Sequence, residues 1–255
     1  MKIYKILFVP IIALYLVIFA GGTLNAQPAQ ATLDQARREE IDRIFVHFNH
    51  DTPGAALAVV MNGEIIYKQG YGMSNLEYGI PITPSSIFQV GSISKQFTAM
   101  CFILLVQQGK ISADDDIRKH IPEVPDFGET ITIRHLLYHT SGLRDEGHLF
   151  ALARWRDSDL KTQSDVINFV KRQKELNFKP GEECLYCNTG YTLLAEIVER
   201  ISGQSLREFA DEHIFKPLGM KNTHFHDNHL EIIKKPDVCI RSSEWWGLHY
   251  QYPCL

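Results

Sequence analysis

The sequence predicts an α+β fold, in which one antiparallel hairpin is followed by a mostly helical region. The hairpin is indicated by the apolar run Ala55 to Met61, the turn dipeptide Asn62-Gly63 and the return strand Glu64 to Gly70. Helical periodicity dominates from Ser92 onward. A single hairpin is not a stable sheet, and the later sequence shows no convincing partner strands. We therefore expect the sheet to be incomplete.

Composition and charge are those of an ordinary globular protein. The chain has 255 residues, of which 45% are hydrophobic and 22% charged. This length fits one large domain or two small ones, and it is ample for a packed core. The net charge is -4 and no basic block occurs, so we expect no nucleic-acid partner.

The N-terminal segment predicts an export signal. Lys2 and Lys5 give a positive start, residues 6–20 are almost wholly apolar, and Ala26 or Ala31 offers a cleavage position. We expect residues 1–26, or 1–31, to be removed as a signal peptide. The alternative is an uncleaved membrane anchor, because the apolar run is near the lower limit for a span. Both readings place the folded part outside the cytoplasm, so we expect a secreted or periplasmic protein.

The predicted helices follow in chain order. Thr32 to Asn49 spaces its apolar residues as an amphipathic helix does. A short extended run, Ile87 to Val90, precedes a long apolar helix that opens at Ser92 and stops at Gly109. The density of apolar residues predicts a central position for this helix. Further helices are expected at Ile133–Tyr138 with Thr132 as N-cap, from Ser164 as N-cap to about Gln173, at Tyr191–Ile201, and from Ser205 as N-cap to Ile214.

The cysteines allow disulfides without defining them. Their number is odd, which leaves at least one thiol unpaired within a monomer. A C-x-x-C motif occurs once, and a redox pair or half of a zinc site would show the same pattern. We expect neither role, because no second C-x-x-C and no thioredoxin-like βαβ pattern accompanies it. The cysteines are Cys101, Cys184, Cys187, Cys239 and Cys254, and the motif is Cys184 to Cys187.

Ser92 and Lys95 form an S-x-x-K motif at the start of the long apolar helix. Residues three apart share a helix face, so the Lys95 amine would lie beside the Ser92 hydroxyl. A serine needs such a neighbouring base to act as a nucleophile, and a helix N-terminus favours developing negative charge. The motif alone is weak, since Ser158 to Lys161 also matches it in a polar stretch, and a plain serine N-cap would give the same residue.

Tyr186 and Asn188 form the Y-x-N motif of the chain. A tyrosine near a lysine can act as a base, and an asparagine amide can hold a substrate carbonyl. A buried tyrosine followed by a turn asparagine would produce the same letters, so the motif needs support from its context.

The two motifs together, in this order and spacing, resemble those of the serine β-lactamases and penicillin-binding proteins. The resemblance is strongest to the branch of class C β-lactamases, D-alanyl-D-alanine carboxypeptidases and esterases, and it runs from about residue 35 to about residue 235. One departure is Cys187, where a small residue such as serine is usual. The matching segments are Phe88–Thr98, Ile133–Leu143, Pro180-Gly181, Tyr186–Tyr191 and Pro217–Met220.

This resemblance implies a β-lactamase/transpeptidase-like α+β fold, with an antiparallel sheet packed with helices and a helical region. It also implies acyl transfer by double displacement, in which Ser92 attacks an amide or ester carbonyl and water hydrolyses the acyl-enzyme. Lys95 and Tyr186 would share the proton transfers, and Asn188 would orient the substrate. The implied partner is a small-molecule or peptidoglycan-like substrate, with no metal and no organic cofactor. β-Lactam, D-Ala-D-Ala peptide and ester substrates all remain open.

Two groups of histidines receive no catalytic assignment from the sequence. His139 lies in the His139 to Leu143 segment, which the resemblance implies to be structural. The second group has ligand types suited to zinc, but a polar loop after a helix gives the same composition, and we expect no metal there. Its members are His224, His226, Asp227 and His229.

The end of the sequence departs from the family pattern. The family carries a third motif, a basic residue or histidine followed by a small residue and glycine, on a strand beside the nucleophile. No such motif occurs downstream of Asn188, and the family's remaining strands are missing too. We therefore expect a partial β-lactamase-related domain over residues 27–236 and an atypical tail over residues 237–255. The alternative to an active hydrolase is a non-catalytic remnant.

Overall fold

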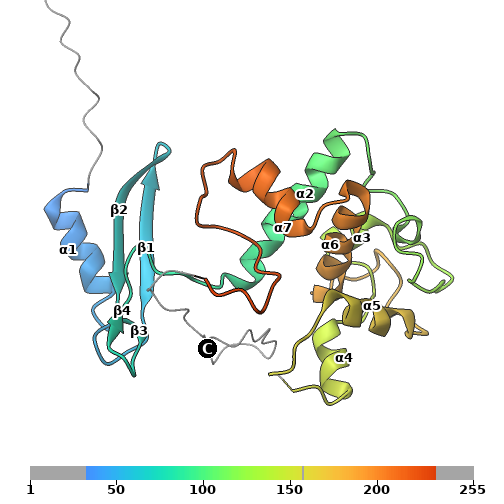
Figure 1. The fold of residues 1–255 in the computed structure, drawn as a ribbon, viewed down its shortest axis with the longest axis horizontal. Coiled ribbons are helices and arrows are strands. Elements are labelled where there is room, and N and C mark those ends of the chain that lie inside the picture. Colours follow the sequence, from blue (N-terminus) through green and yellow to red (C-terminus); the bar gives the residue numbers. More distant parts are fainter. Residues whose placement is uncertain (1–32, 157, 234–255) are drawn as a thin grey trace, which may run out of the picture.

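The computed structural model describes residues 33–156 and 158–233 (Figure 1). The expected signal segment, the tail over residues 237–255, and Cys239 and Cys254 lie outside the described residues. None of the helices in the described ranges combines the length and the apolar character that crossing a membrane requires.

The hairpin forms where the sequence predicts it. Strand β1 (Ala55–Met61) pairs antiparallel with strand β2 (Glu64–Tyr71), and a register shift occurs between Val59 and Val60. Asn62 and Gly63 join the strands with positive φ angles of 52° and 80°. A turn with two positive φ angles matches the twist of a hairpin, which explains the Asn-Gly dipeptide.

Helix α1 (Gln35–Ile44) covers one face of this hairpin. The Asp42 carboxylate accepts hydrogen bonds from the hydroxyls of Tyr67 and Tyr71, at 2.8 and 2.7 Å. The ring of Phe45, just past the helix, stacks on Tyr71 with ring centroids 4.6 Å apart. Helix α1 is shorter than the predicted Thr32 to Asn49, because Phe45 already leaves the helical conformation.

The opposite face of the hairpin is largely open to solvent. Ala56, Ala58 and Val60 alternate along β1 on that face and are all exposed, Val60 to 61%. A second two-stranded sheet, β3 (Met73–Asn75) with β4 (Ile80–Pro81), was not predicted. Neither sheet contains a third strand among the described residues, as the prediction of an incomplete sheet requires.

The long apolar helix, α2, spans Ser94–Gln107. A 3-10 turn, Gly91–Ile93, precedes it, so Ser92 lies within that turn, just before the α-helix, instead of opening it. The predicted extended run Ile87 to Val90 is irregular in the structure. Helix α2 packs against two later helices, α6 (Asn188–Ser202) and α7 (Leu206–Ala210), which confirms its central position.

Helix α6 is the hub of the helical region, because it packs against α2, α7 and three other helices (Figure 1). Those three are α3 (Ile133–Leu137), α4 (Glu146–Leu152) and α5 (Gln163–Lys171). A short 3-10 helix, Ile117–Lys119, and a π-helical turn, Asp211–Phe215, complete the set. The largest fully buried side chains of this core are Phe150, Phe209, Phe215, Leu105, Ile117, Ile121, Ile133, Leu136, Leu143, Leu193, Leu194 and Ile197.

Other helices also differ from the prediction. Helix α7 ends at Ala210 and continues as the π-helical turn, instead of running as one helix to Ile214. The N-cap of α5 is Thr162 instead of Ser164, because Thr162 and Asp165 form a capping box that Ser164 cannot form. Helix α6 begins at Asn188, earlier than the predicted Tyr191. Helix α4 was not predicted at all. The caps at Thr132 and Ser205 are confirmed, each with a capping box.

Candidate active site

The Ser92 hydroxyl lies at the exposed start of the α2 region. Gly91 has a φ of 54°, a conformation that suits glycine, and it turns the chain into the 3-10 turn that presents Ser92. Lys95 lies one turn further along, with its Nζ 3.2 Å from Ser92 Oγ. The spacing of the S-x-x-K motif therefore does place amine and hydroxyl together. Within this turn the Ile93 N–H already donates to the Val90 carbonyl oxygen at 3.2 Å, whereas the first N–H groups of a helix have no intrahelical partner.

Tyr186 and Asn188 reach the same point from the other side. The Tyr186 hydroxyl is 2.6 Å from Ser92 Oγ, and the Lys95 ammonium lies 4.8 Å from the centre of the Tyr186 ring. Asn188, the first residue of α6, accepts a hydrogen bond from Lys95 Nζ through Oδ1 at 2.8 Å. The structure thus brings all four residues predicted from the sequence into one cluster, in which Lys95 contacts each of the other three.

His139 supports the loop that carries Tyr186. Its ring contacts the rings of both Tyr186 and Tyr191, at centroid distances of 4.6 and 5.3 Å. Its Nδ1 accepts the backbone N–H of Cys187 at 3.1 Å, and its carbonyl oxygen accepts that of Leu185 at 2.9 Å. Burial, together with the charge of Lys95, lowers the pKa of His139. A neutral imidazole that accepts a backbone N–H holds the loop in position.

The structure explains why residue 142, in the same segment as His139, is a glycine. Its φ is 71°, and a Cβ on it would lie 2.1 Å from the carbonyl oxygen of Phe178. Asn177 N–H donates to the Gly142 carbonyl oxygen at 2.7 Å, so the two chain segments run in direct contact. A side chain at this position would push apart the segments that precede the Tyr186 loop.

Asp145 holds the start of α6 and was missed by the sequence reasoning. One carboxylate oxygen accepts the Asn188 N–H at 2.6 Å and the other accepts the Gly147 N–H at 3.0 Å. Asp145 is the N-cap of α4, so it joins the N-termini of two helices. The letters Asp145-Glu146-Gly147 carried a signal that was not used, because aspartate before glutamate is typical of a helix start.

The C-x-x-C pair does not form a disulfide. Cys184 is exposed with its Sγ 3.5 Å from the Tyr138 carbonyl oxygen, and Cys187 is buried with its Sγ 3.4 Å from that of Leu143. Burial raises the pKa of Cys187 to about 11, which keeps its thiol protonated. Within the described part of the chain, neither sulfur belongs to a cluster of three metal-ligand side chains.

The chain is similar in sequence to a known family of proteins. The sequence profile of the family described as Beta-lactamase matches residues 36–232, most of the chain. The chain belongs to the β-lactamase family. Penicillin-binding protein 4* of Bacillus subtilis (strain 168) is 34% identical to this β-lactamase-family chain over 201 residues, which are 78% of the chain and 44% of that protein. Protein flp of Staphylococcus aureus (strain MW2) is 31% identical over 203 residues, 74% of the chain and 38% of that protein.

A solved structure shows the same fold. The octameric penicillin-binding protein homologue from Pyrococcus abyssi superimposes with a TM-score of 0.67 at 32% identity, over 82% of this chain and 47% of that one. The similarity confirms the predicted β-lactamase-type α+β fold. This chain spans less than half the length of each of these three relatives.

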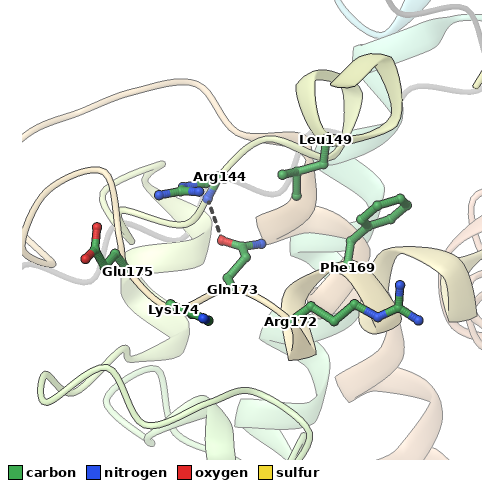
Figure 2. Close-up of a pocket in the computed structure, with 7 residues that line it drawn as sticks. All are labelled: Arg144, Leu149, Phe169, Arg172, Gln173, Lys174 and Glu175. Carbon is green, nitrogen blue, oxygen red and sulfur yellow. Dashed lines mark hydrogen bonds between the residues drawn. The ribbon is translucent and has the colours of Figure 1, made fainter. Parts of the chain in front are cut away.

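A separate hollow lies between α4 and the end of α5 (Figure 2). Its volume is about 430 Å³, and none of Ser92, Lys95 and Tyr186 lines it. The hollow is therefore distinct from the cluster around Ser92. Its lining residues are Arg144, Leu149, Phe169, Arg172, Gln173, Lys174 and Glu175.

Glu146 is a buried acid on α4, next to Asp145 and in contact with Thr192 of α6. Only 1% of it is exposed, one carboxylate oxygen accepts the Thr192 hydroxyl at 2.8 Å, and the other has no hydrogen-bond partner within the described ranges. Burial raises the pKa of Glu146 from its usual 4.5 to about 7, against the lowering effect of the Thr192 hydrogen bond. The folded chain therefore holds a proton on Glu146 that the unfolded chain releases at lower pH.

This raised pKa makes the stability of the chain depend on pH. The stabilisation from protonated Glu146 is complete below about pH 4.5 and is lost as the pH rises through about 7. We expect the stability of Glu146→Gln relative to the wild type to rise with pH, by about 2–3 kcal/mol in free energy of unfolding between about pH 5 and pH 8. Urea unfolding of both proteins at the two pH values measures this.

The matched control is Glu175→Gln, which changes an exposed carboxylate. Its stability relative to the wild type is expected to stay the same across this range. A Glu146→Gln difference that is constant with pH would show that Glu146 is already ionised in the folded chain.

Proposed function

We propose that this chain is a serine hydrolase that forms an acyl-enzyme on β-lactam, D-Ala-D-Ala peptide or ester substrates. The observation that carries the proposal is the position of Ser92 Oγ, within hydrogen-bonding distance of both Tyr186 OH, at 2.6 Å, and Lys95 Nζ, at 3.2 Å. A hydroxyl that contacts a tyrosine–lysine pair can pass its proton to whichever member of the pair is deprotonated, and an activated serine requires such a neighbouring base.

The geometry supports the following steps. Ser92 Oγ bonds to the substrate carbonyl carbon while its proton passes to the Tyr186–Lys95 pair. The carbonyl oxygen becomes an oxyanion at the helix start, where the Ser92 N–H donates to it. The pair then returns the proton to the leaving nitrogen or oxygen as the carbonyl carbon–heteroatom bond breaks. Water attacks the acyl-enzyme by the same route, and Ser92 regains its proton.

Asn188 and its supports keep this arrangement rigid. Its side-chain oxygen fixes the Lys95 ammonium at 2.8 Å, which leaves the amide nitrogen for a substrate carbonyl. Asp145 fixes its backbone, and His139 fixes the neighbouring residue, Cys187. Such positioning is worth a large factor in rate, because the reacting groups need no further ordering.

A second candidate, a non-catalytic relative that keeps the ligand-contacting residues, is favoured by the open sheet. In the part of the chain that the structure describes, no layer covers the apolar face of β1 or the exposed apolar side chains of α2, Met100 and Ile103 among them, although an α+β domain buries such faces. The sequence also lacks the third motif, which supplies the family's second oxyanion donor.

The two candidates differ in turnover. A polypeptide made of these 255 residues alone is expected to hydrolyse nitrocefin and p-nitrophenyl esters about 10²- to 10³-fold more slowly than intact relatives, since one missing oxyanion donor has about this effect. Steady-state hydrolysis, with the Ser92→Ala variant as background, measures it. Ser92-dependent turnover equal to that of intact relatives would contradict this expectation. The absence of any Ser92-dependent hydrolysis or labelling would contradict the hydrolase proposal itself.

A further inference from the structure

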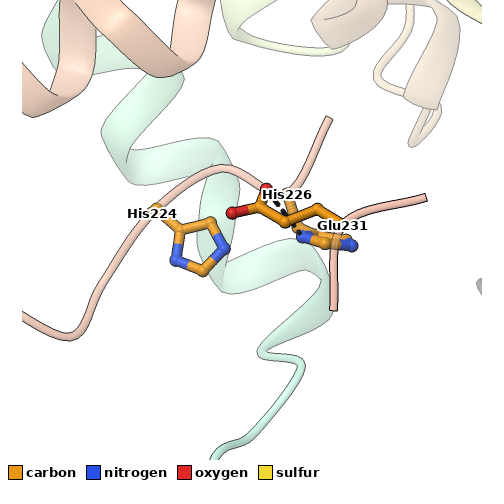
Figure 3. Close-up of side chains that lie close together, drawn as sticks. All are labelled: His224, His226 and Glu231. Carbon is orange, nitrogen blue, oxygen red and sulfur yellow. Dashed lines mark ion pairs between the residues drawn. The ribbon is translucent and has the colours of Figure 1, made fainter. Parts of the chain in front are cut away.

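A cluster of side chains that could bind a metal lies on the loop after the π-helical turn. It shares no residue with the Ser92 cluster. His224, His226 and Glu231 place one ligand atom each within 4.8 Å of one another (Figure 3). His226 Nδ1 is 3.9 Å from Glu231 Oε2, and the two imidazole centroids are 5.7 Å apart. From the sequence we expected no metal at this histidine group. Two of its members, Asp227 and His229, are not in the cluster, and Glu231, which completes it, was not foreseen.

Phe225 anchors the loop that carries the two histidines. It packs against the core and contacts the ring of Phe215 at a centroid distance of 6.1 Å. The two histidines flank Phe225 in the sequence, and the structure brings both of them to Glu231.

Burial at His224 supplies a second, independent observation. Its Nε2 is buried and has no hydrogen-bond partner among the described residues. A buried polar nitrogen without a partner is uncommon in native proteins, and an ion that is not part of the protein chain is one recognised reason for it. Imidazole nitrogen is also a preferred ligand of zinc.

The surrounding charges are compatible with a cation. Arg207, on α7, pairs with Asp227 at 3.1 Å and with both carboxylate oxygens of Glu231. Two carboxylates around one guanidinium leave one net negative charge before any ion binds. Arg207 also fixes the orientation of Glu231, as outer partners of metal-binding carboxylates commonly do.

We propose that His224, His226 and Glu231 bind a zinc ion, with water as the fourth ligand. Two imidazoles and one carboxylate are a ligand set that suits zinc, whereas calcium and magnesium prefer oxygen alone. Ligands about 2.0–2.1 Å from a tetrahedral zinc lie about 3.3 Å apart, so the side chains move together on binding. The ion joins the loop to α7 through the Arg207–Glu231 pair and takes no part in the Ser92 chemistry.

The test titrates Zn²⁺ into the metal-free chain, purified without a histidine tag, by isothermal titration calorimetry. We expect one zinc per chain, and a loss of affinity of about tenfold or more in His224→Gln, His226→Gln and Glu231→Gln. His229→Gln, which removes an exposed histidine of the same loop, is the matched control and is expected to change the affinity less than about twofold. Glu231 is itself exposed, so its variant tests the site without opening the core.

Substitution with Co²⁺ identifies the ligands without any mutation. A tetrahedral site of two nitrogens and oxygen gives intense visible d–d bands and no thiolate-to-cobalt charge-transfer band in the near ultraviolet. A thiolate band would place the ion on cysteine and overturn the proposal. Equal zinc affinities in the three ligand variants and the wild type, or no zinc binding at all, would overturn it as well.

Discussion

Replacing Ser92 with alanine is expected to abolish covalent labelling of the chain by a fluorescent penicillin or a fluorophosphonate. Removing a serine nucleophile costs about 10⁶-fold in rate in a well-studied protease, which leaves only spontaneous modification to be seen. The physical reason here is that Ser92 Oγ contacts both Tyr186 OH and Lys95 Nζ. Fluorescence of the labelled band after electrophoresis measures the effect.

Ser158→Ala is the matched control for this experiment. Ser158 opens the second S-x-x-K match of the chain, which ends at Lys161, and that match lies outside the Tyr186 cluster. Its labelling is expected to equal that of the wild type. Retained labelling in Ser92→Ala, or labelling lost in Ser158→Ala instead, would exclude Ser92 as the nucleophile.

Lys95→Met is expected to slow acylation by about 10²- to 10⁴-fold, the usual contribution of a positioned acid or base. Lys95 Nζ bridges Ser92 Oγ and Asn188 Oδ1, at 3.2 and 2.8 Å, so its loss both removes a proton carrier and releases the Asn188 amide. The change is measured as the rate of single-turnover labelling with the penicillin reagent. The final amount of label is not informative, because a slowly acylated site is still labelled in time.

The control for that experiment is Lys161→Met, at the equivalent position of the second S-x-x-K match. The Lys161 ammonium lies 5.5 Å from the Phe150 ring and contributes to packing there. The acylation rate of the Lys161→Met variant is expected to equal that of the wild type. An unchanged rate in Lys95→Met would mean that Tyr186 acts without the lysine.

Local signals predicted the parts of the fold that depend on neighbouring residues. Asn62-Gly63 located the turn of the hairpin to the residue, because only a turn with two positive φ angles fits there. Thr132 and Ser205 located two helix starts, because their side chains cap their own helices. The start of α5 was misplaced by choosing Ser164, since the partner at the third position, Asp165, identifies Thr162 as the cap.

Features that depend on distant parts of the chain were harder to predict. The contact between Ser92 and Lys95 follows from helical spacing, whereas Tyr186 meets Ser92 across 94 positions of sequence. Only the family resemblance joined the two motifs before the structure did. Asp145, Glu146 and Glu231 were missed, because their roles come from tertiary contacts with α6, the buried interior and the His224 loop.

The most direct measurement of the central claim is the site of the covalent adduct. The chain is labelled with a penicillin, digested, and sequenced by tandem mass spectrometry. We expect one acyl group per chain, attached to Ser92 and not to Ser94, its neighbour in the same peptide. An adduct on Ser158, on the exposed thiol of Cys184, or spread over several lysines would show that the Ser92 cluster does not carry out acyl transfer.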